Sequence, residues 1–550
     1  MKRFKKINIY KYKKIVLISI IALAFLLRFY RLADYPALNA DEAAIAYNAY
    51  SLIETGLDEH SNPWPVHFQS FNDFKPGGYF YLVLPFVKLL GLTEWAVRIP
   101  GALLGVATVL ILYLLVKELF KDDTLALVSS FFLAISSWHI HFSRGGWEVN
   151  AATFFMTIGV WLFIRSFKKP KLLILSSLFF VFSLYTYHAA RIVVPLLVIG
   201  LAIIYRKKII GNIKGAVIAG IIGLVVLTPL MIDFAGPAVT SRVAGVGLFA
   251  DPGPLARINE LRGEHADFQS LPTRILHNKA VNYSLAFADN WARHFWGEFL
   301  FLSSDEIQRN RVPETGLMYL FDILFVVAGL VFIAKKPKGW SPIILWLVIA
   351  PFAAALTFQS PHALRAQSMV IPLVVISAYG LISLSKWLRK IVHKKALLNS
   401  IFVLFFLIIS WQFARYLHMY WVHMAKEYPY SSQYGLKELT AYIKEEESKY
   451  DEVIITTRYD QPYMLLLFYL KYPPAQFQEN HVLSGRDKYG FSTVDNFDKY
   501  YFRPIDYDQE APNSPRSLII GTDDEIPEHA NIVKTIYSPN GEPAFEIVAN

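Results

Sequence analysis

The chain has 550 residues, of which 54% are hydrophobic and 15% aromatic, and it contains no cysteine. This composition excludes an ordinary soluble domain, disulfides and cysteine zinc sites, and it favours a membrane protein. The net charge of +10 is uneven, because residues 425–550 carry 12 Lys and Arg against 21 Asp and Glu while the remainder carries 42 against 23, so it indicates membrane orientation and not nucleic-acid binding.

The first long apolar run, residues 15–33, follows a basic leader. Its length suffices to cross a hydrocarbon core of roughly 30 Å, and the apolar runs that follow favour an uncleaved signal anchor over a cleaved signal peptide. The other candidate spans are residues 97–119, 124–140, 149–166, 172–189, 191–205, 213–232, 316–334, 340–357, 364–385 and 396–416. The sequence thus predicts a polytopic α-helical membrane protein with about eleven spans.

Basic residues alternate along the chain in a way that predicts the topology. With the N-terminus in the cytoplasm, the leader and five later loops lie inside, and together they hold 25 of the 54 Lys and Arg residues. The predicted membrane domain covers residues 1–424 and has two long outer loops, at about 34–96 and 233–315. Residues 425–550 then form an extracytoplasmic domain.

This C-terminal domain is predicted to be a small α/β domain. A helix is expected around Gly435 to Ser448, followed by strand-like runs DEVIITT, RSLIIGT and NIVKTIYS between turn-rich stretches. Its placement outside the cytoplasm leads to the hypothesis that it helps to select an acceptor.

The first outer loop begins with two adjacent carboxylates, Asp41 and Glu42. The apolar residues of DEAAIAYNAYSLIE follow helical spacing, which predicts an amphipathic helix along the membrane interface. Acidic residues at its start either cap the helix or perform chemistry, and the pair alone does not separate these two interpretations.

A lysine in the same loop, Lys75, precedes a Pro and two Gly. The apolar segment 79–92 that follows is too short to span and predicts a re-entrant or interfacial helix. A lysine beside a helix N-terminus at the membrane surface is a candidate phosphate ligand, and the alternative is a lysine that extends to the interface.

Further charged residues lie at the outer ends of predicted spans, against the positive-inside trend. Such cations need partners, and an anionic lipid headgroup is one; internal salt bridges are the alternative. These candidates are Arg144, Glu148, His188, Arg191, His362 and Arg365.

Taken in order, several segments resemble the GT-C glycosyltransferases, the superfamily of protein O-mannosyltransferases and lipid A aminoarabinose transferases. The resemblance rests on ADEAAIAYNAYSLIETGLDEHSNPWPVHFQSFNDFKPGGYFYL, RIPGALLGVATVLILYLL, SSWHIHFSRGGWEVNAATFF and NYSLAFADNWARHFWGEFLFLSSD, and it covers most of residues 1–385. No P-loop or dinucleotide-binding motif is present, so chemistry driven by ATP is not expected.

The resemblance implies that Asp41 is the catalytic base, with Glu42 beside it. It also implies that Lys75 contacts the phosphate of a polyprenyl-phosphate sugar and that Arg365 is a second phosphate ligand, with Arg144 and Arg191 as looser candidates. Glu148, His188 and His362 remain site candidates without a role. The usual Lys-Pro-Pro is Lys75-Pro76-Gly77 here, which predicts a looser turn.

The implied reaction is a single displacement outside the cytoplasm that inverts the anomeric carbon. No metal is expected, although Asp41 and Glu42 could instead hold a divalent cation, as acidic motifs do in oligosaccharyltransferase relatives. A protein, a lipid-linked glycan and an envelope polymer are all compatible acceptors.

Two other function classes compete with the enzyme. A transporter or flippase of lipid-linked sugars would have paired half-sequences and charges in mid-span, and neither is evident. A non-catalytic receptor would give the first outer loop no function.

Overall fold

A computed structural model gives the structure of the chain and describes residues 9–71, 73–234, 247–485 and 492–550. The chain folds into two compact units, each built from segments that are far apart in the sequence. Unit 1 comprises Met1–Tyr30, Ala102–Ser143 and Glu148–Tyr416, and unit 2 comprises Arg31–Gly101, Arg144–Trp147 and Leu417–Asn550.

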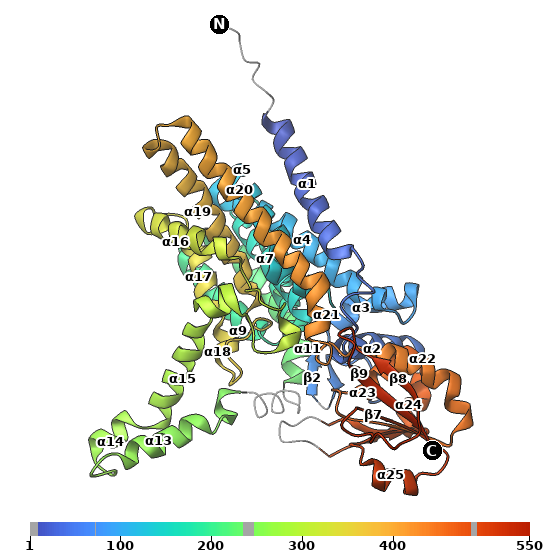
Figure 1. The fold of residues 1–550 in the computed structure, drawn as a ribbon. Coiled ribbons are helices and arrows are strands. Elements are labelled where there is room, and N and C mark those ends of the chain that lie inside the picture. The colour runs from blue at the N-terminus through green and yellow to red at the C-terminus, as the bar shows by residue number, and fades with distance from the viewer. Residues whose placement is uncertain (1–8, 72, 235–246, 486–491) are drawn as a thin grey trace. The chain divides into compact units, whose positions relative to one another are not determined.

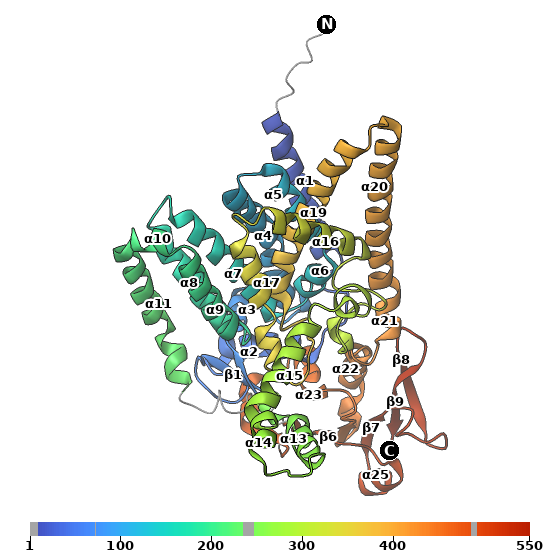
Figure 2. The ribbon, with the colours of Figure 1, turned by 90° about the vertical axis from the view of Figure 1, so that its left-hand side faces the viewer.

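Unit 1 is helical in its described residues (Figures 1 and 2). Within it, α8 packs between α7 and α11, and α16 packs against α19. In Figure 1, α15 leads away from α18 towards α13 and α14. Its elements are α1 (Ile9–Phe29), most of α4 (Glu94–Phe120), α5 (Asp123–Ile135), α6 (Ser137–Ser143), α7 (Glu148–Ser166), α8 (Leu172–Thr186), α9 (Ala190–Ile204), α10 (Arg206–Ile210), α11 (Ile213–Asp233), η1 (Leu248–Ala250), α13 (Gly253–Gly263), α14 (Leu271–Leu276), α15 (Lys279–Arg293), η2 (Glu298–Leu302), η3 (Gln308–Asn310), α16 (Leu320–Lys335), α17 (Ser341–Ile349), α18 (Phe352–Ala355), η4 (Gln367–Met369), α19 (Val370–Ile391) and α20 (Lys395–His418).

The predicted span at residues 124–140 is broken into α5 and α6, which meet at an angle of 58°. Where α5 ends, the carbonyls of Leu133 and Ala134 accept hydrogen bonds from the buried Arg28 guanidinium at 3.3 and 3.1 Å. The same guanidinium lies 2.7 Å from His139 Nδ1. Arg28 therefore adds side-chain donors for carbonyls at a helix end, although Leu133 also accepts from the N–H of Ser136.

The predicted count of about eleven spans is only partly matched by helix length. In the described parts of the chain, five helical stretches are long and apolar enough to cross a membrane, or six if α5 and α6 form one bent span. Three of the other predicted spans fall on shorter apolar helices, namely α8, α9 and the α17–α18 pair. The number eleven therefore remains a prediction.

Unit 2 combines the first outer loop with the C-terminal part of the chain (Figure 1). The compact units do not coincide with the predicted membrane domain, 1–424, and the predicted soluble domain, 425–550. The predicted domains were defined by their position relative to the membrane, and that division stays a prediction. The elements of unit 2 are α2 (Ala40–Thr55), β1 (His67–Ser70), β2 (Asp73–Pro76), α3 (Gly78–Leu90), the start of α4, η5 (Met419–His423), α21 (Met424–Glu427), α22 (Leu436–Glu446), η6 (Glu447–Lys449), β3 (Glu452–Ile455), α23 (Pro462–Leu470), α24 (Pro474–Asn480), β4 (Val482–Leu483), β5 (Val494–Phe497), β6 (Tyr500–Phe502), α25 (Tyr507–Asn513), β7 (Ser517–Gly521), β8 (Ile532–Tyr537) and β9 (Pro543–Ala549).

The C-terminal part contains a seven-stranded sheet in the order β4-β5-β6-β3-β7-β9-β8. The central strand β3 runs parallel to β6 and β7, and the outer pairs are antiparallel. All five residues of β7 are buried, as its mostly apolar sequence SLIIG predicts for a strand in the middle of a sheet. The predicted helix and the three predicted strands correspond to α22, β3, β7 and β8, so the expected C-terminal sheet region is confirmed.

Helix α2 is more buried than its predicted interfacial position implies. It packs against α3 and against α23 and α24 of the C-terminal part, and eleven of its sixteen residues are buried. The helix is therefore buried on more than one side, and its expected position along the membrane interface stays a prediction. The predicted short apolar helix is present as α3, which has 13 residues.

Candidate active site

The start of α2 is fixed by a capping box. Asn39 Oδ1 accepts from the backbone N–H of Glu42 at 3.0 Å, and Glu42 Oε2 accepts from the backbone N–H of Asn39 at 3.4 Å. These bonds satisfy two donors that a helix start leaves free. The capping interpretation of the acidic pair is thus confirmed for Glu42.

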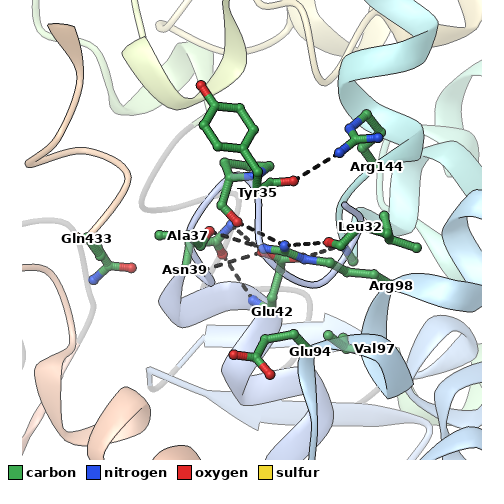
Figure 3. A network of polar contacts seen from close by, with 12 residues as sticks. Leu32, Tyr35, Ala37, Asn39, Glu42, Glu94, Val97, Arg98, Arg144 and Gln433 are labelled. Atoms are coloured by element: carbon green, nitrogen blue, oxygen red, sulfur yellow. Dashed lines mark hydrogen bonds and ion pairs between the residues drawn. The ribbon is translucent and has the colours of Figure 1, made fainter. Parts of the chain in front are cut away.

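A buried arginine that the sequence analysis did not single out, Arg98, is the main partner of Glu42 (Figure 3). Its Nε and Nη2 lie 2.8 and 2.7 Å from the two oxygens of Glu42. The remaining guanidinium hydrogens donate to the carbonyls of Leu32, Pro36 and Ala37 at 2.9 to 3.1 Å. Arg98 is 0% and Glu42 1% exposed, so this bidentate pair joins the start of α4 to the chain that leads into α2.

The other member of the acidic pair, Asp41, is the more accessible one. Its side chain is 24% exposed, and its Oδ1 lies 2.5 Å from Lys75 Nζ. Strand β2 of a two-stranded hairpin carries Lys75, opposite Phe68 of β1, and Lys75 Nζ also lies 4.6 Å from the ring centre of Phe71. The structure therefore brings together the predicted base and the predicted phosphate ligand.

The predicted loosening of the turn at Gly77 is wrong. The Gly77 N–H donates to the carbonyl of Val66 at 2.9 Å. A Cβ at this position would lie 2.8 Å from that carbonyl oxygen and 3.0 Å from the Phe68 ring. Any residue with a Cβ, proline included, would collide with the Val66 carbonyl just before β1 and crowd the Phe68 ring, and proline would also lose the hydrogen bond.

Arg144 lies in the same unit but is not open to solvent. It is 1% exposed, donates to Tyr420 Oη at 3.0 Å and to the carbonyl of Tyr35 at 3.1 Å, and lies 4.7 Å from the ring centre of Trp421. Two residues later, the N–H of Gly146 donates to Glu42 Oε1 at 2.7 Å. In this geometry Arg144 fixes the segment beside Glu42 and does not present a free cation to a phosphate.

Two glutamines of the C-terminal part hold the two ends of α2. Gln433 Oε1 accepts from the N–H of Ala40 at 2.6 Å, and its Nε2 donates to the carbonyl of Asp460. Gln478 Nε2 lies 3.0 Å from Ser51 Oγ and 2.8 Å from the carbonyl of Asp58. Ala40, the residue before Asp41, is therefore positioned by the side chain of Gln433, 393 residues further along the chain.

A buried acid, Glu59, lies behind the helix. It is 0% exposed, and its Oε1 accepts from Asn48 Nδ2 at 3.1 Å. Burial raises the pKa of Glu59 to about 8, and the negative charge of Asp58 adds to this rise. Burial also lowers the pKa of the neighbouring His60 to about 4, with a smaller effect from His481. Both groups are thus mainly uncharged near neutral pH.

We expect Glu59→Gln to change how stability depends on pH. Folded Glu59 retains a proton that the unfolded chain releases above about 4.5, so the stability contributed by its neutral form is lost as pH rises from about 4.5 towards 8. His60 acts in the opposite sense only below about 6.5. Between pH 6.5 and 8.5 the thermal unfolding midpoint of wild type should therefore fall more steeply than that of the variant.

The matched control for this experiment is Glu54→Gln, an exposed glutamate at the end of α2. It should retain the wild-type slope. Parallel curves for wild type and Glu59→Gln would show that Glu59 does not titrate in this range.

The remaining candidates belong to unit 1 and have partners there. Arg365 Nη1 donates to Thr357 Oγ1 at 2.7 Å, and His362 Nδ1 lies 3.3 Å from the buried Asp305. Arg191 Nη1 lies 3.0 Å from His188 Nδ1, and Glu148 is the first residue of α7. The roles of all five residues remain predictions.

Comparison with known proteins places these features in a family context. The sequence profile described as "Dolichyl-phosphate-mannose-protein mannosyltransferase" matches residues 75–232. The chain is 34% identical to YkcB of Bacillus subtilis (strain 168), which carries a provisional name as a mannosyltransferase, over 93 residues. That match covers 17% of this chain and only 13% of YkcB.

Two solved structures share the fold. ArnT from Cupriavidus metallidurans bound to undecaprenyl phosphate has a TM-score of 0.55 at 10% identity, with 97% of both chains covered. The archaeal oligosaccharyltransferase AglB from Archaeoglobus fulgidus, in complex with an inhibitory peptide and a dolichol-phosphate, has a TM-score of 0.50 at 12% identity, with 85% of this chain and 64% of AglB covered. The resemblance to GT-C glycosyltransferases is confirmed.

Proposed function

We propose that the chain is an integral-membrane glycosyltransferase that moves a sugar from a polyprenyl phosphate to an acceptor hydroxyl outside the cytoplasm. In this proposal it has about eleven spans, its N-terminus is cytoplasmic and residues 425–550 lie outside. The lipid phosphates in the related ArnT and AglB structures support a lipid-linked donor.

The observation that carries the proposal is the Asp41–Lys75 pair. It joins a partly exposed carboxylate at a helix start to a lysine on a two-stranded hairpin, at 2.5 Å. The neighbouring Glu42 has both oxygens engaged by Arg98 and is buried. Of the two predicted catalytic carboxylates, Asp41 is therefore assigned to the substrate and Glu42 to positioning.

The proposed reaction is a single displacement. Asp41 accepts the proton of the acceptor hydroxyl as its oxygen attacks the anomeric carbon, and the bond from that carbon to the phosphate oxygen breaks with its electron pair remaining on the phosphate. Attack from the opposite side inverts the anomeric configuration. Lys75 stabilises the negative charge that grows on the departing polyprenyl phosphate.

The pairing of Asp41 with Lys75 gives the donor a part in activation. When a donor phosphate binds Lys75, the interaction between Lys75 and Asp41 becomes weaker. The Asp41 carboxylate is then a better base for the acceptor hydroxyl. Base strength would therefore rise when the donor is bound.

The direct test is transfer of radiolabelled sugar by the purified chain in lipid nanodiscs. A panel of polyprenyl-phosphate sugars is offered with peptide, glycolipid and polymer acceptors, with and without chelator. Formation of product with release of polyprenyl phosphate supports the enzyme, and loss of product with chelator would overturn the metal-free reaction. Movement of intact donor across liposome bilayers without transfer would instead favour the transporter.

Lys75→Gln should weaken use of the donor more than use of the acceptor. Loss of a charge-assisted contact to phosphate is worth roughly 1.5–3 kcal/mol, or about 10- to 150-fold in kcat/KM for the donor. Inhibition by added polyprenyl phosphate should weaken in parallel. Lys88→Gln, an exposed lysine on α3, is the matched control, and an equal loss in both variants would contradict a specific phosphate contact.

Unit 1 offers Arg365 and Arg191 as further phosphate ligands in this proposal. The same competition assay tests them by substitution. Arg144 is the weaker candidate for this role, because it is 1% exposed and its guanidinium is bonded to Tyr420 and Tyr35.

A further inference from the structure

Three loops that the charge pattern predicts to be cytoplasmic meet around one cavity in unit 1. The cavity has a volume of about 630 Å³ and lies between the end of α4, the α7–α8 turn and the α9–α10 segment. This volume is within the range of roughly 300–1,000 Å³ that is typical of ligand sites. The reaction proposed above uses none of these residues.

Positive charge dominates the lining. Lys121, Lys168 and Lys208 contribute three cations and Glu118 a single carboxylate, which leaves a net charge of +2. Glu118 Oε1 lies 2.7 Å from both Lys121 and Lys168, so one carboxylate is shared between two lysines. Arg165 adds a further cation 3.7 Å from Glu118 Oε2.

The nearby acidic residues of the same loop are already engaged. Asp123 lies 2.9 Å from both Lys13 and Lys117, and Asp122 caps α5 by accepting from the N–H groups of Thr124 and Leu125. The charge of the cavity is therefore not neutralised by these two carboxylates.

Two aromatic side chains, Phe167 and Tyr205, contact the third lysine, Lys208. The rings of Phe167 and Tyr205 lie 5.0 Å apart, and Lys208 Nζ lies 4.6 and 5.4 Å from their centres. Apolar side chains, among them Leu119 and Leu173, line another part of the cavity. A ligand that fits this lining has an anionic group for the lysines and an apolar part for the aromatic and aliphatic side chains.

We propose that this cavity binds the phosphate headgroup of an anionic phospholipid. Basic pockets between transmembrane helices on the cytoplasmic side are suited to such headgroups, because the surrounding leaflet supplies the lipid and the lysines supply the charge. The lipid phosphate contacts Lys208 and Lys121, and the start of its acyl chains contacts Leu119 and Leu173. The site is independent of the sugar-transfer chemistry.

The test is native mass spectrometry of the full-length chain in detergent. Wild type should retain one phosphatidylglycerol more tightly than phosphatidylcholine. Lys208→Gln should weaken phosphatidylglycerol binding roughly fivefold, and Lys208→Glu should weaken it further, since one basic residue near an anionic headgroup contributes about that much. Lys208 forms no salt bridge among the described residues, so its replacement should lower the unfolding temperature only slightly, through loss of the contacts with Phe167 and Tyr205.

The matched control is Lys338→Glu, an exposed lysine of another loop predicted to be cytoplasmic. It should bind phosphatidylglycerol as wild type does. Equal weakening by Lys338→Glu, equal affinity for the two lipids, or unchanged binding in Lys208→Glu would each overturn the proposal. Inorganic phosphate that displaces phosphatidylglycerol at equal concentration would assign the cavity to free phosphate and overturn the lipid as its ligand.

Discussion

Asp41→Asn is expected to lower the rate of sugar transfer by roughly 10²- to 10⁴-fold, the usual contribution of a positioned general base. Asparagine has nearly the same shape and still accepts a hydrogen bond from Lys75, but it cannot take the acceptor proton. The loss should therefore appear in kcat at saturating donor, with little change in donor affinity.

The measurement is single-turnover transfer with labelled donor, accompanied by donor binding and the thermal unfolding midpoint. Asp34→Asn is the matched control, since its side chain is 67% exposed in the same loop and its nearest basic partner, Arg31, is 3.9 Å away. Activity of Asp41→Asn within tenfold of wild type would remove Asp41 as the base. A reduced unfolding midpoint with weakened donor binding would instead assign the loss to a disturbed site.

Asp41 and Lys75 could each be singled out from the sequence because each stands next to a recognisable local pattern. Asp41 opens a helix with its own capping signals, and Lys75 precedes a Pro-Gly-Gly turn and a short apolar helix. Local patterns of this kind fix where a side chain starts. They do not give the contact between Asp41 and Lys75; the family resemblance implied a role for each residue but not their pairing.

The partners of Glu42 and α2 could not be predicted in this way. Arg98 lies 56 residues from Glu42, and Gln433 lies 393 residues from Ala40. An arginine near the outer end of an apolar run needs a partner, which was the available signal for Arg98. For Gln433 no local signal exists, because an amide that caps a distant helix leaves no periodicity in its own segment.

The continuity of one predicted span could not be predicted for a related reason. Hydropathy records how apolar a run is, but the length of a helix also depends on the polar groups at its ends. In the run at 124–140 the chain bends by 58° at Ser136, and the Arg28 guanidinium donates to the carbonyls of Leu133 and Ala134 beside the bend. The apolar run was identified correctly, and its continuity was not.

Removal of Arg98 is expected to have the largest effect on stability. Arg98→Leu leaves the Glu42 carboxylate buried without its cation and also frees the carbonyls of Leu32, Pro36 and Ala37. Loss of one partner from a buried ion pair costs roughly 3–5 kcal/mol. The exposed Lys88 of α3 provides the matched control, since Lys88→Leu removes a cation of the same unit without a buried partner.

The double variant Arg98→Leu/Glu42→Leu distinguishes an ion pair from two independent residues. If the cost of Arg98→Leu comes mainly from the stranded charge of Glu42, removal of both charges should restore part of the stability, and the double variant should be more stable than the sum of the single effects implies. Chemical unfolding of all four forms in one detergent measures this difference. Effects that add to within about 0.5 kcal/mol would show that Arg98 acts mainly through the three carbonyls and not through Glu42. Transfer activity should follow the same order, because Glu42 and Asp41 are neighbours on one helical turn and the position of one sets the position of the other.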